Sequence, residues 1–317
     1  MNTVFFIGAG VSKESGTPTE KELWKQVILK WQETGNKKLK QILDFASYLN
    51  LSNQGEIVNT DFTQLLTIID LSLERNASLG CYDEDLLREI RRNMVYAMCL
   101  VLENIFEPEK MKSFRVFCTQ LSPCDTVITL NYDTVLDRIM EYYIGRVSYG
   151  FKSIINHDNK KQKNGNREQL LLKPHGSLNW LFCNCCNQIF LLSPSEGLSW
   201  LDKDKYCPFD GNILQNVIIA PSYYKRFLVP QLHDVWNKCF HRIKEAQVIN
   251  FIGYSFPPGD IHIVYLIKKA ILAGEEIPQI NIITPDPRGT VLKRCEKMFA
   301  NFHYYKMSFG QYFKRYG

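Results

Sequence analysis

Polar side chains that could take part in catalysis follow short apolar segments of this chain. Asn131 and Asp133 come directly after the segment 125–130, and His175 comes shortly after the segment 170–172. An amide can orient a ligand, a carboxylate can stabilise positive charge, and an imidazole can accept a proton near neutral pH. Each residue also has an ordinary structural explanation, because Asn and Asp cap helices and a histidine can be satisfied inside a core. We take them as candidate catalytic residues because other polar turns follow the same pattern.

A glycine-rich turn follows the first apolar segment, 3–7. Glycines between a buried strand and a helix allow backbone N–H groups to approach a pyrophosphate, as Gly8-Ala9-Gly10 could do. The same three residues can also form a simple strand-to-helix turn, and the usual third glycine of the dinucleotide-binding fingerprint is absent. Ser12, Gly16 and Pro18 complete this segment. The residues alone leave a nucleotide site and a plain turn equally open.

Two further turns end apolar segments in the C-terminal part of the chain. Gly253 and Ser255 follow the segment 248–252, and Asp286 stands between two prolines after the segment 280–284. Asp286 could simply set a turn. The carboxyl ends of parallel strands, however, meet at one edge of a sheet, where ligands bind. We therefore expect these residues to lie near Asn131 and His175.

The elements that must position these residues alternate along the chain. Apolar strands and amphipathic helices follow one another after residue 125, which predicts an α/β fold with a Rossmann-like parallel sheet covered by helices on both faces. Helical spacing of apolar residues over 19–121 predicts a large helical insertion, and Thr19 followed by Glu22 is typical of a helix N-terminus. We expect one domain over 1–317.

Bulk composition excludes several classes of protein. Of the 317 residues, 45% are hydrophobic and 22% are charged, as in ordinary soluble proteins. No apolar run approaches the roughly 20 residues of a membrane span, and the first residues lack the pattern of a signal peptide. The net charge of +5 is too small to indicate nucleic-acid binding. We expect a cytoplasmic protein without a membrane partner or a direct nucleic-acid partner.

Cysteines cluster in the segment 177–215, which we expect to form a small ribbon-like insertion. Cys183, Cys186 and Cys207 have a spacing close to that of zinc ribbons, and Asp210 takes the place of a fourth cysteine. Three thiolates and a carboxylate can bind zinc in a tetrahedron, although four thiolates are commoner. Structural zinc and a decayed ribbon with free thiols both remain open. A catalytic zinc is disfavoured because no histidine accompanies the cluster.

Five segments together resemble the motifs of sirtuins, in the order in which sirtuins carry them. They are Gly8-Ala9-Gly10-Val11-Ser12 with the following Ser15-Gly16-Thr17-Pro18, Thr129-Leu130-Asn131-Tyr132-Asp133, His175-Gly176-Ser177, Gly253-Tyr254-Ser255-Phe256 and Thr284-Pro285-Asp286. The resemblance implies that NAD+ binds with its phosphates on the first turn. It places Asn131 and His175 around the nicotinamide ribose, with Asp133 orienting the network on the ribose side. It also implies zinc in the cysteine-bearing segment.

Departures from the sirtuin pattern bear on the reaction. Protein-deacylating sirtuins have an acidic residue, Phe and Arg after the proline of the first motif, whereas Pro18 is followed here by Thr19-Glu20-Lys21; Leu130 also replaces a Gln. The forms of the segments 131–133, 175–180 and 253–257 resemble a divergent bacterial branch whose members hydrolyse NAD+ in antiphage defence. The resemblance implies an NAD+ hydrolase that releases nicotinamide and ADP-ribose. The alternatives are an NAD-dependent protein deacylase or ADP-ribosyltransferase, and a sensor that binds NAD or ADP-ribose without chemistry.

Control of such an activity is a further expectation. An uncontrolled NAD+ hydrolase would be toxic to its cell. We therefore expect the chain to form a homo-oligomer or to be held by a separate regulatory or sensor protein. The predicted helical insertion is a candidate for that contact.

Overall fold

The computed structural model describes residues 2–13, 16–49, 60–102, 111–155, 167–193, 204–224 and 229–316. The chain forms two compact units. The first unit comprises Met1–Gly16, Asn104–Ile218 and Phe227–Gly317. The second unit comprises Thr17–Glu103 and Ile219–Arg226.

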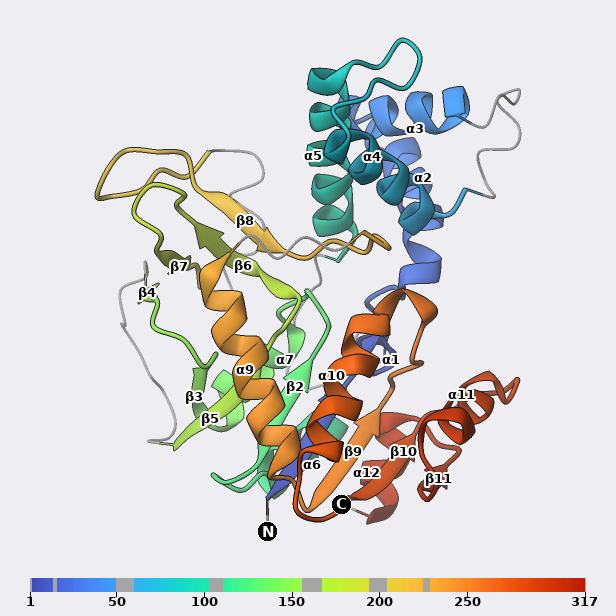
Figure 1. Cartoon of the computed structure of the whole chain (residues 1–317), viewed down its shortest axis with the longest axis vertical. Helices are drawn as coiled ribbons and strands as arrows, with labels where there is room; N and C mark the ends of the chain where they lie inside the picture. The colour runs from blue at the N-terminus through green and yellow to red at the C-terminus, as the bar shows by residue number, and fades with distance from the viewer. Residues whose placement is uncertain are drawn as a thin grey trace. The chain divides into compact units, whose positions relative to one another are not determined.

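The first unit is built on a seven-stranded parallel sheet with the strand order β11-β10-β9-β1-β2-β5-β3 (Figure 1). Its strands are β1 (Thr3–Ile7), β2 (Thr126–Thr129), β3 (Gly145–Ser148), β5 (Arg167–Leu172), β9 (Val248–Ile252), β10 (Gln279–Ile283) and β11 (His303–Tyr305). Every residue of β2 and β9 is buried, as expected for central strands of a parallel sheet that is covered on both faces. This architecture confirms the predicted α/β, Rossmann-like fold.

Helices cover both faces of this sheet. They are α1 (Ala9–Ser12), α6 (Lys112–Gln120), α7 (Val135–Tyr143), α9 (Pro230–Lys244), α10 (Ile261–Leu272), α11 (Thr290–Met298) and α12 (Phe309–Tyr316). On β1, Phe5 contacts Phe117 of α6, whereas its neighbour Phe6 contacts Phe251 of β9. Because successive side chains of a strand point to opposite faces, α6 lies on one face only. In Figure 1, α9 and α10 lie in front of the sheet.

The strand order reverses beside β1, which pairs with β2 on one side and with β9 on the other. In open α/β sheets, ligands bind in the crevice at such a reversal, beyond the carboxyl ends of the strands. The turns after β1 and β9 meet there. The N–H of Gly10 donates to the carbonyl oxygen of Gly253 at 3.0 Å, and the N–H of Gly8 donates to that of Ile252 at 2.9 Å.

A second sheet contains the strand that begins directly after His175. It has four strands in the order β4-β7-β6-β8, namely β4 (Ile154–Ile155), β6 (Gly176–Phe182), β7 (Ile189–Leu191) and β8 (Gln215–Ile218). Gly176 begins β6 with a φ of 81°, and a Cβ there would lie 1.9 Å from the carbonyl oxygen of Val217 on β8. Only glycine fits at this position. The contact therefore determines the direction in which the chain continues after His175.

The second unit is helical. Its helices are α2 (Glu20–Thr34), α3 (Lys37–Leu49), α4 (Phe62–Glu74) and α5 (Glu84–Leu102), with α5 packing against the other three. The predicted start of α2 is confirmed, because the N–H of Thr19 donates to Glu22 Oε2 at 2.9 Å. The N–H of Tyr223 donates to Thr67 Oγ1 at 2.9 Å, which joins the segment 219–226 to α4. The predicted helical segment 19–121 therefore covers the four helices α2 to α5 of this unit, but also α6, which belongs to the first unit.

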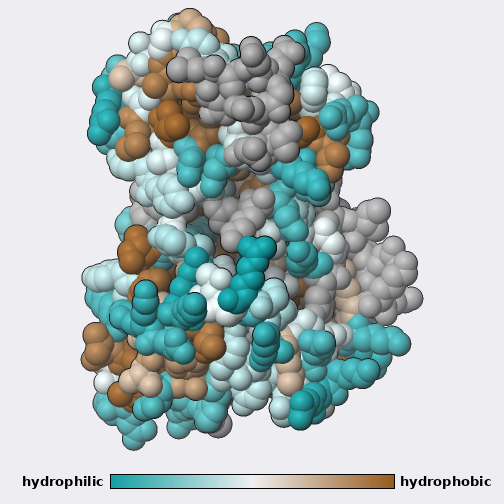
Figure 2. All heavy atoms as spheres, turned by 90° about the vertical axis from the view of Figure 1, so that its right-hand side faces the viewer, coloured by the Kyte–Doolittle hydropathy of each residue, from teal (hydrophilic) through white to brown (hydrophobic). Residues whose placement is uncertain are grey.

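The described surface is mixed in hydropathy. Figure 2 shows one face on which hydrophobic groups are interspersed among hydrophilic residues. Among the described residues, no helix is long and apolar enough to cross a membrane.

The close contact between the turns after β1 and β9 leads to a prediction for Gly253. Its φ is 62°, and a Cβ would lie 2.7 Å from the backbone N of Val11. Gly289 has a φ of 66° but no atom within 4 Å of its Cβ position, so Gly289→Ala isolates the backbone cost. We expect Gly289→Ala to lower the free energy of unfolding by about 1–2 kcal/mol. We expect Gly253→Ala to cost about 1–3 kcal/mol more, because of overpacking.

Urea unfolding followed by tryptophan fluorescence measures both variants. Equal losses of stability in the two variants would contradict the close contact between Gly253 and the backbone of Val11.

Candidate functional site

Asn131 ties the end of β2 to the turn after β1. Its side chain is 9% exposed, and its Nδ2 donates to Ser12 Oγ at 2.8 Å and to the carbonyl oxygen of Gly8 at 3.2 Å. Its backbone N–H donates to Thr129 Oγ1 at 3.2 Å. The amide of Asn131 is thus held in a fixed orientation by Ser12 and Gly8, two residues that the sequence also placed in the candidate site.

Asp133 lies two residues further on and is also buried. Its Oδ1 accepts from the N–H of Val135 at 3.0 Å, at the start of α7. Burial raises the pKa of the Asp133 carboxyl, while the Lys173 ammonium, the Val135 N–H and the Ser12 hydroxyl oppose that shift. The helix-capping explanation considered from the sequence therefore has direct support, and the catalytic role of Asp133 stays a prediction.

A buried ion pair contacts the loop that carries Asp133. Lys173 and Asp137 have side chains that are 0% exposed, and their Nζ and Oδ2 atoms lie 2.9 Å apart. Lys173 Nζ also donates to the backbone carbonyl oxygen of Asp133 at 2.7 Å, and the hydroxyl of Tyr149 donates to Asp137 Oδ1 at 2.7 Å. The end of β5 is thereby joined to the loop that carries Asp133. Sequence reasoning did not single out Lys173, although it stands two residues before His175.

His175 is 2% exposed and lies against a second histidine. Its Nε2 is 2.8 Å from His262 Nε2, and the two rings stack with centroids 5.0 Å apart. The ring of Tyr132, the neighbour of Asn131, also stacks with the His175 ring, with centroids 6.1 Å apart. Tyr132 thus connects His175 to the loop that carries Asn131.

His262, Asp260 and Trp236 belong to this site but were missed from the sequence. Asp260 ends the short helix η4 (Pro258–Asp260), and His262 lies in the first turn of α10. The ring of Trp236 lies 5.6 Å from that of His262, and its indole N–H donates to the carbonyl oxygen of Pro174 at 2.9 Å. The available signal was an acidic residue and a histidine shortly after the Gly253 turn.

The predicted phosphate turn has protein partners of its own. The N–H groups of Gly8 and Gly10 both donate to backbone carbonyl oxygens, as described above. Ala9 and Gly10 are nevertheless exposed at the end of β1. Gly16 has a φ of 87° and is exposed, and Pro18 belongs to the second unit. Phosphate binding by this segment stays a prediction.

The late turns have different roles. Gly253 packs against the first turn, and Ser255 is exposed, with its carbonyl oxygen accepting from Arg294 Nη1 at 2.8 Å. Contact of these two residues with a cofactor also stays a prediction.

Asp286 caps α11. Its Oδ2 accepts from the N–H groups of Val291 and Leu292 at 3.0 Å and from the Tyr304 hydroxyl at 2.8 Å. Burial opposes ionisation of this carboxyl, but the donors from Leu292, Tyr304 and Val291 outweigh it and hold its pKa below the usual range. The turn-setting explanation therefore has direct support, and the predicted cofactor contact stays a prediction.

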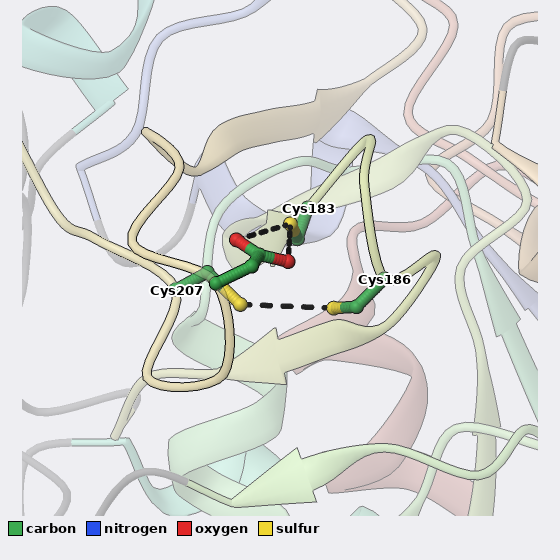
Figure 3. Close-up of side chains that lie close together, drawn as sticks. Cys183, Cys186 and Cys207 are labelled. Carbon is green, nitrogen blue, oxygen red and sulfur yellow. Dashed lines mark hydrogen bonds between the residues drawn. The ribbon is translucent and has the colours of Figure 1, made fainter.

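The cysteine-bearing segment brings its four predicted ligands together, and Figure 3 labels the three cysteines among them. Cys183 Sγ lies 3.2 Å from Asp210 Oδ2, and Cys186 Sγ lies 3.7 Å from Cys207 Sγ. One ligand atom from each of the four residues lies within 4.8 Å of all the others. Cys183 and Cys207 are part of a small apolar core with Leu181, Phe190, Leu192 and Leu214. The donor set is thus compatible with a tetrahedral zinc ion.

Comparisons with known proteins agree with this geometry. The model of the SIR2-like domain matches residues 125–304, which is more than half of the chain. The chain belongs to the SIR2-like family. The matched residues of this sirtuin-like chain include Asn131, Asp133 and His175 and begin after the Gly8 turn.

Solved structures share the fold of the sirtuin-like chain. A Sir2 homologue in complex with NAD is 17% identical, with a TM-score of 0.50, and the match covers 99% of this chain and 87% of the other. A Sir2 homologue mutant in complex with 2′-O-acetyl ADP-ribose is 16% identical, with a TM-score of 0.50 and coverage of 99% and 89%. No curated protein sequence matches the chain.

The buried ion pair leads to a stability prediction. Lys173→Met leaves the Asp137 carboxylate buried beside Tyr149 without its cation, which costs about 3–5 kcal/mol of unfolding free energy. Lys268, on the exposed side of α10, is the control, and we expect Lys268→Met to change stability by less than about 0.5 kcal/mol. Adding Asp137→Asn to Lys173→Met removes the unpaired charge, and we expect it to restore part of the loss.

Chemical denaturation of the three variants is the measurement. A Lys173→Met chain as stable as Lys268→Met would contradict the buried pair.

Proposed function

We propose that this sirtuin-like chain hydrolyses NAD+ at the bond between nicotinamide and ribose. The observation that carries the proposal is the grouping of Asn131, Asp133 and His175 beyond the carboxyl ends of β2 and β5, linked through Ser12, Lys173 and Tyr132. Membership of the SIR2-like family and the likeness in fold to a Sir2 homologue that binds NAD support NAD+ as the substrate.

The residues have distinct roles in this proposal. Cleavage of the glycosidic bond develops positive charge on the ribose, so oriented dipoles and nearby negative charge lower the barrier. Asn131, whose amide is fixed by Ser12 and Gly8, orients the ribose hydroxyls or the attacking water. His175 accepts the proton of that water. The buried Asp133 orients the network on the ribose side.

Water is the proposed acceptor because the segment used by deacylases is different here. Glu20 and Lys21, which stand where deacylating sirtuins have Phe and Arg, form the start of α2. Thr19 and Glu22 fix this helix start by a capping box. Depletion of NAD+ in bacterial antiphage defence is the biological setting that we propose, with control by self-assembly or by a separate sensor protein.

Product analysis tests the reaction. We expect purified chain and NAD+ to give nicotinamide and free ADP-ribose at the same rate with and without an acetyl-lysine peptide. Asn131→Ala and His175→Ala each lower kcat/KM by at least about 100-fold, as for loss of a positioned proton acceptor or orienting group. His233→Ala, which removes an exposed histidine of α9, leaves the rate unchanged.

Two results would contradict the hydrolase. Product formation only with the peptide would identify a deacylase. NAD+ binding that is lost in Asn131→Ala, without any turnover by the wild type alone or as an assembled oligomer, would identify a sensor.

We also propose that Cys183, Cys186, Cys207 and Asp210 hold a structural zinc ion. Zinc would cross-link the loop after β6 to the loop before β8, which are otherwise joined by the small apolar core around Phe190. Such sites contribute directly to folding stability.

Cys124 supplies a control for the zinc proposal, because it is an exposed thiol outside the cysteine-bearing segment. We expect one zinc per wild-type chain by elemental analysis. Cys186→Ser loses this zinc and lowers the Tm, since a ligand is removed, whereas Cys124→Ser keeps the zinc and the wild-type Tm. Equal zinc content in Cys186→Ser and the wild type would contradict the assignment.

A further inference from the structure

A second cluster of metal-binding side chains lies at His175, away from the cysteines. His175, Asp260 and His262 each offer one ligand atom, and these three atoms lie within 4.8 Å of one another. They come from the turn after β5, the end of η4 and the first turn of α10, so three separate segments converge on one point.

We infer that His175, Asp260 and His262 form a binding site for a divalent transition-metal ion such as Zn²⁺ or Co²⁺. Two imidazoles and one carboxylate, with a further position left for water, are the ligand set of many catalytic and regulatory zinc sites. The same set also suits other first-row divalent ions. The sulfur-rich cluster at Cys183 has a different donor chemistry, so the two sites are distinguishable.

The facing nitrogens are the strongest argument for this site. His175 Nε2 and His262 Nε2 lie 2.8 Å apart, close enough for one hydrogen to be shared between them. When each ring carries its hydrogen on Nδ1, both Nε2 lone pairs point to the space between the rings. A tetrahedral ion with Zn–N distances of about 2.0–2.1 Å holds its two nitrogens about 3.3 Å apart, so it takes the place of the shared hydrogen once the two nitrogens separate by about half an ångström.

Surrounding contacts hold the ligands in place. The hydroxyl of Tyr254 donates to Asp260 Oδ2 at 3.0 Å, which is the kind of outer contact that orients a metal-binding carboxylate. The Trp236 ring lies beside His262, and its indole N–H fixes the carbonyl of Pro174, the residue before His175. The ligand set is therefore pre-organised.

The burial of the three ligands determines from which side an ion reaches them. His175 is 2% exposed, whereas Asp260 and His262 are half-buried, so an ion reaches the cluster from their side. A bound ion occupies the Nε2 of His175 and removes it as a proton acceptor. This consequence rests on the proposed function: the metal acts as a reversible inhibitor of NAD+ cleavage. The binding site itself does not depend on it.

Cobalt titration of the full chain tests the site directly. Co²⁺ bound by nitrogen and oxygen gives weak visible bands, whereas Co²⁺ bound by the cysteines adds intense thiolate charge-transfer bands, so the two sites are followed separately. We expect the wild type to bind one Co²⁺ with the nitrogen and oxygen spectrum. His262→Gln and Asp260→Asn each weaken this binding by at least about tenfold, the lower limit even for outer-shell changes.

His233→Gln is the matched control, because His233 is an exposed histidine of α9 outside the cluster. We expect it to bind Co²⁺ as the wild type does, and circular dichroism checks that all variants are folded. A folded His262→Gln chain and a folded Asp260→Asn chain that both bind Co²⁺ with wild-type affinity and spectrum would overturn the proposal.

Measuring NAD+ cleavage distinguishes a failure of the metal site from a failure of the proposed function. We expect micromolar Zn²⁺ to slow NAD+ cleavage by the wild type and by His233→Gln, and a chelator to restore the rate. Cobalt binding in a chain that never cleaves NAD+ would support the metal site while the hydrolase fails. NAD+ cleavage in a chain that gives no nitrogen and oxygen cobalt spectrum would overturn the metal site while the hydrolase stands.

Discussion

The turn after β1 and the turn after β9 cross at backbone contact distance, and the candidate site depends on that crossing. A Cβ on Gly8 would lie 2.5 Å from the carbonyl oxygen of Gly253, and one on Gly10 would lie 2.8 Å from it. Because no side chain separates the two turns, backbone hydrogen bonds from Gly8 and Gly10 hold the first turn against the second. Ser12 and the carbonyl of Gly8 then orient Asn131, so the amide is in place before any ligand binds.

Buried charge is the second feature of the site. Lys173 and Asp137 are fully buried, and the Lys173 ammonium also accounts for part of the electrostatic environment of Asp133. Such a pair costs desolvation energy and is weak evidence for stability as such. Its position between β5 and α7 suits a different role, because it fixes the loops that carry Asp133 and His175 relative to each other.

Local patterns predicted much of this arrangement. The apolar runs before Asn131 and His175 are strands of one parallel sheet, and the Thr19 capping box begins a helix as expected. Contacts between distant segments were not predictable in the same way. His262 is 87 residues from His175 in sequence, and only the fold shows that their nitrogens meet. Asp286 matched a cofactor motif, and only the fold shows that the same carboxylate accepts from an N–H group in the first turn of α11.

The central claim is that NAD+ lies beyond the carboxyl ends of β1 and β2 with its nicotinamide ribose beside Asn131. The most direct test is a crystal structure of the His175→Ala variant grown with NAD+, since this variant keeps Asn131 but slows cleavage. The account predicts ribose hydroxyls within hydrogen-bond distance of the Asn131 side chain and the pyrophosphate beside the 8–10 turn. NAD+ bound elsewhere, with Asn131 still contacting only Ser12 and Gly8, would contradict it.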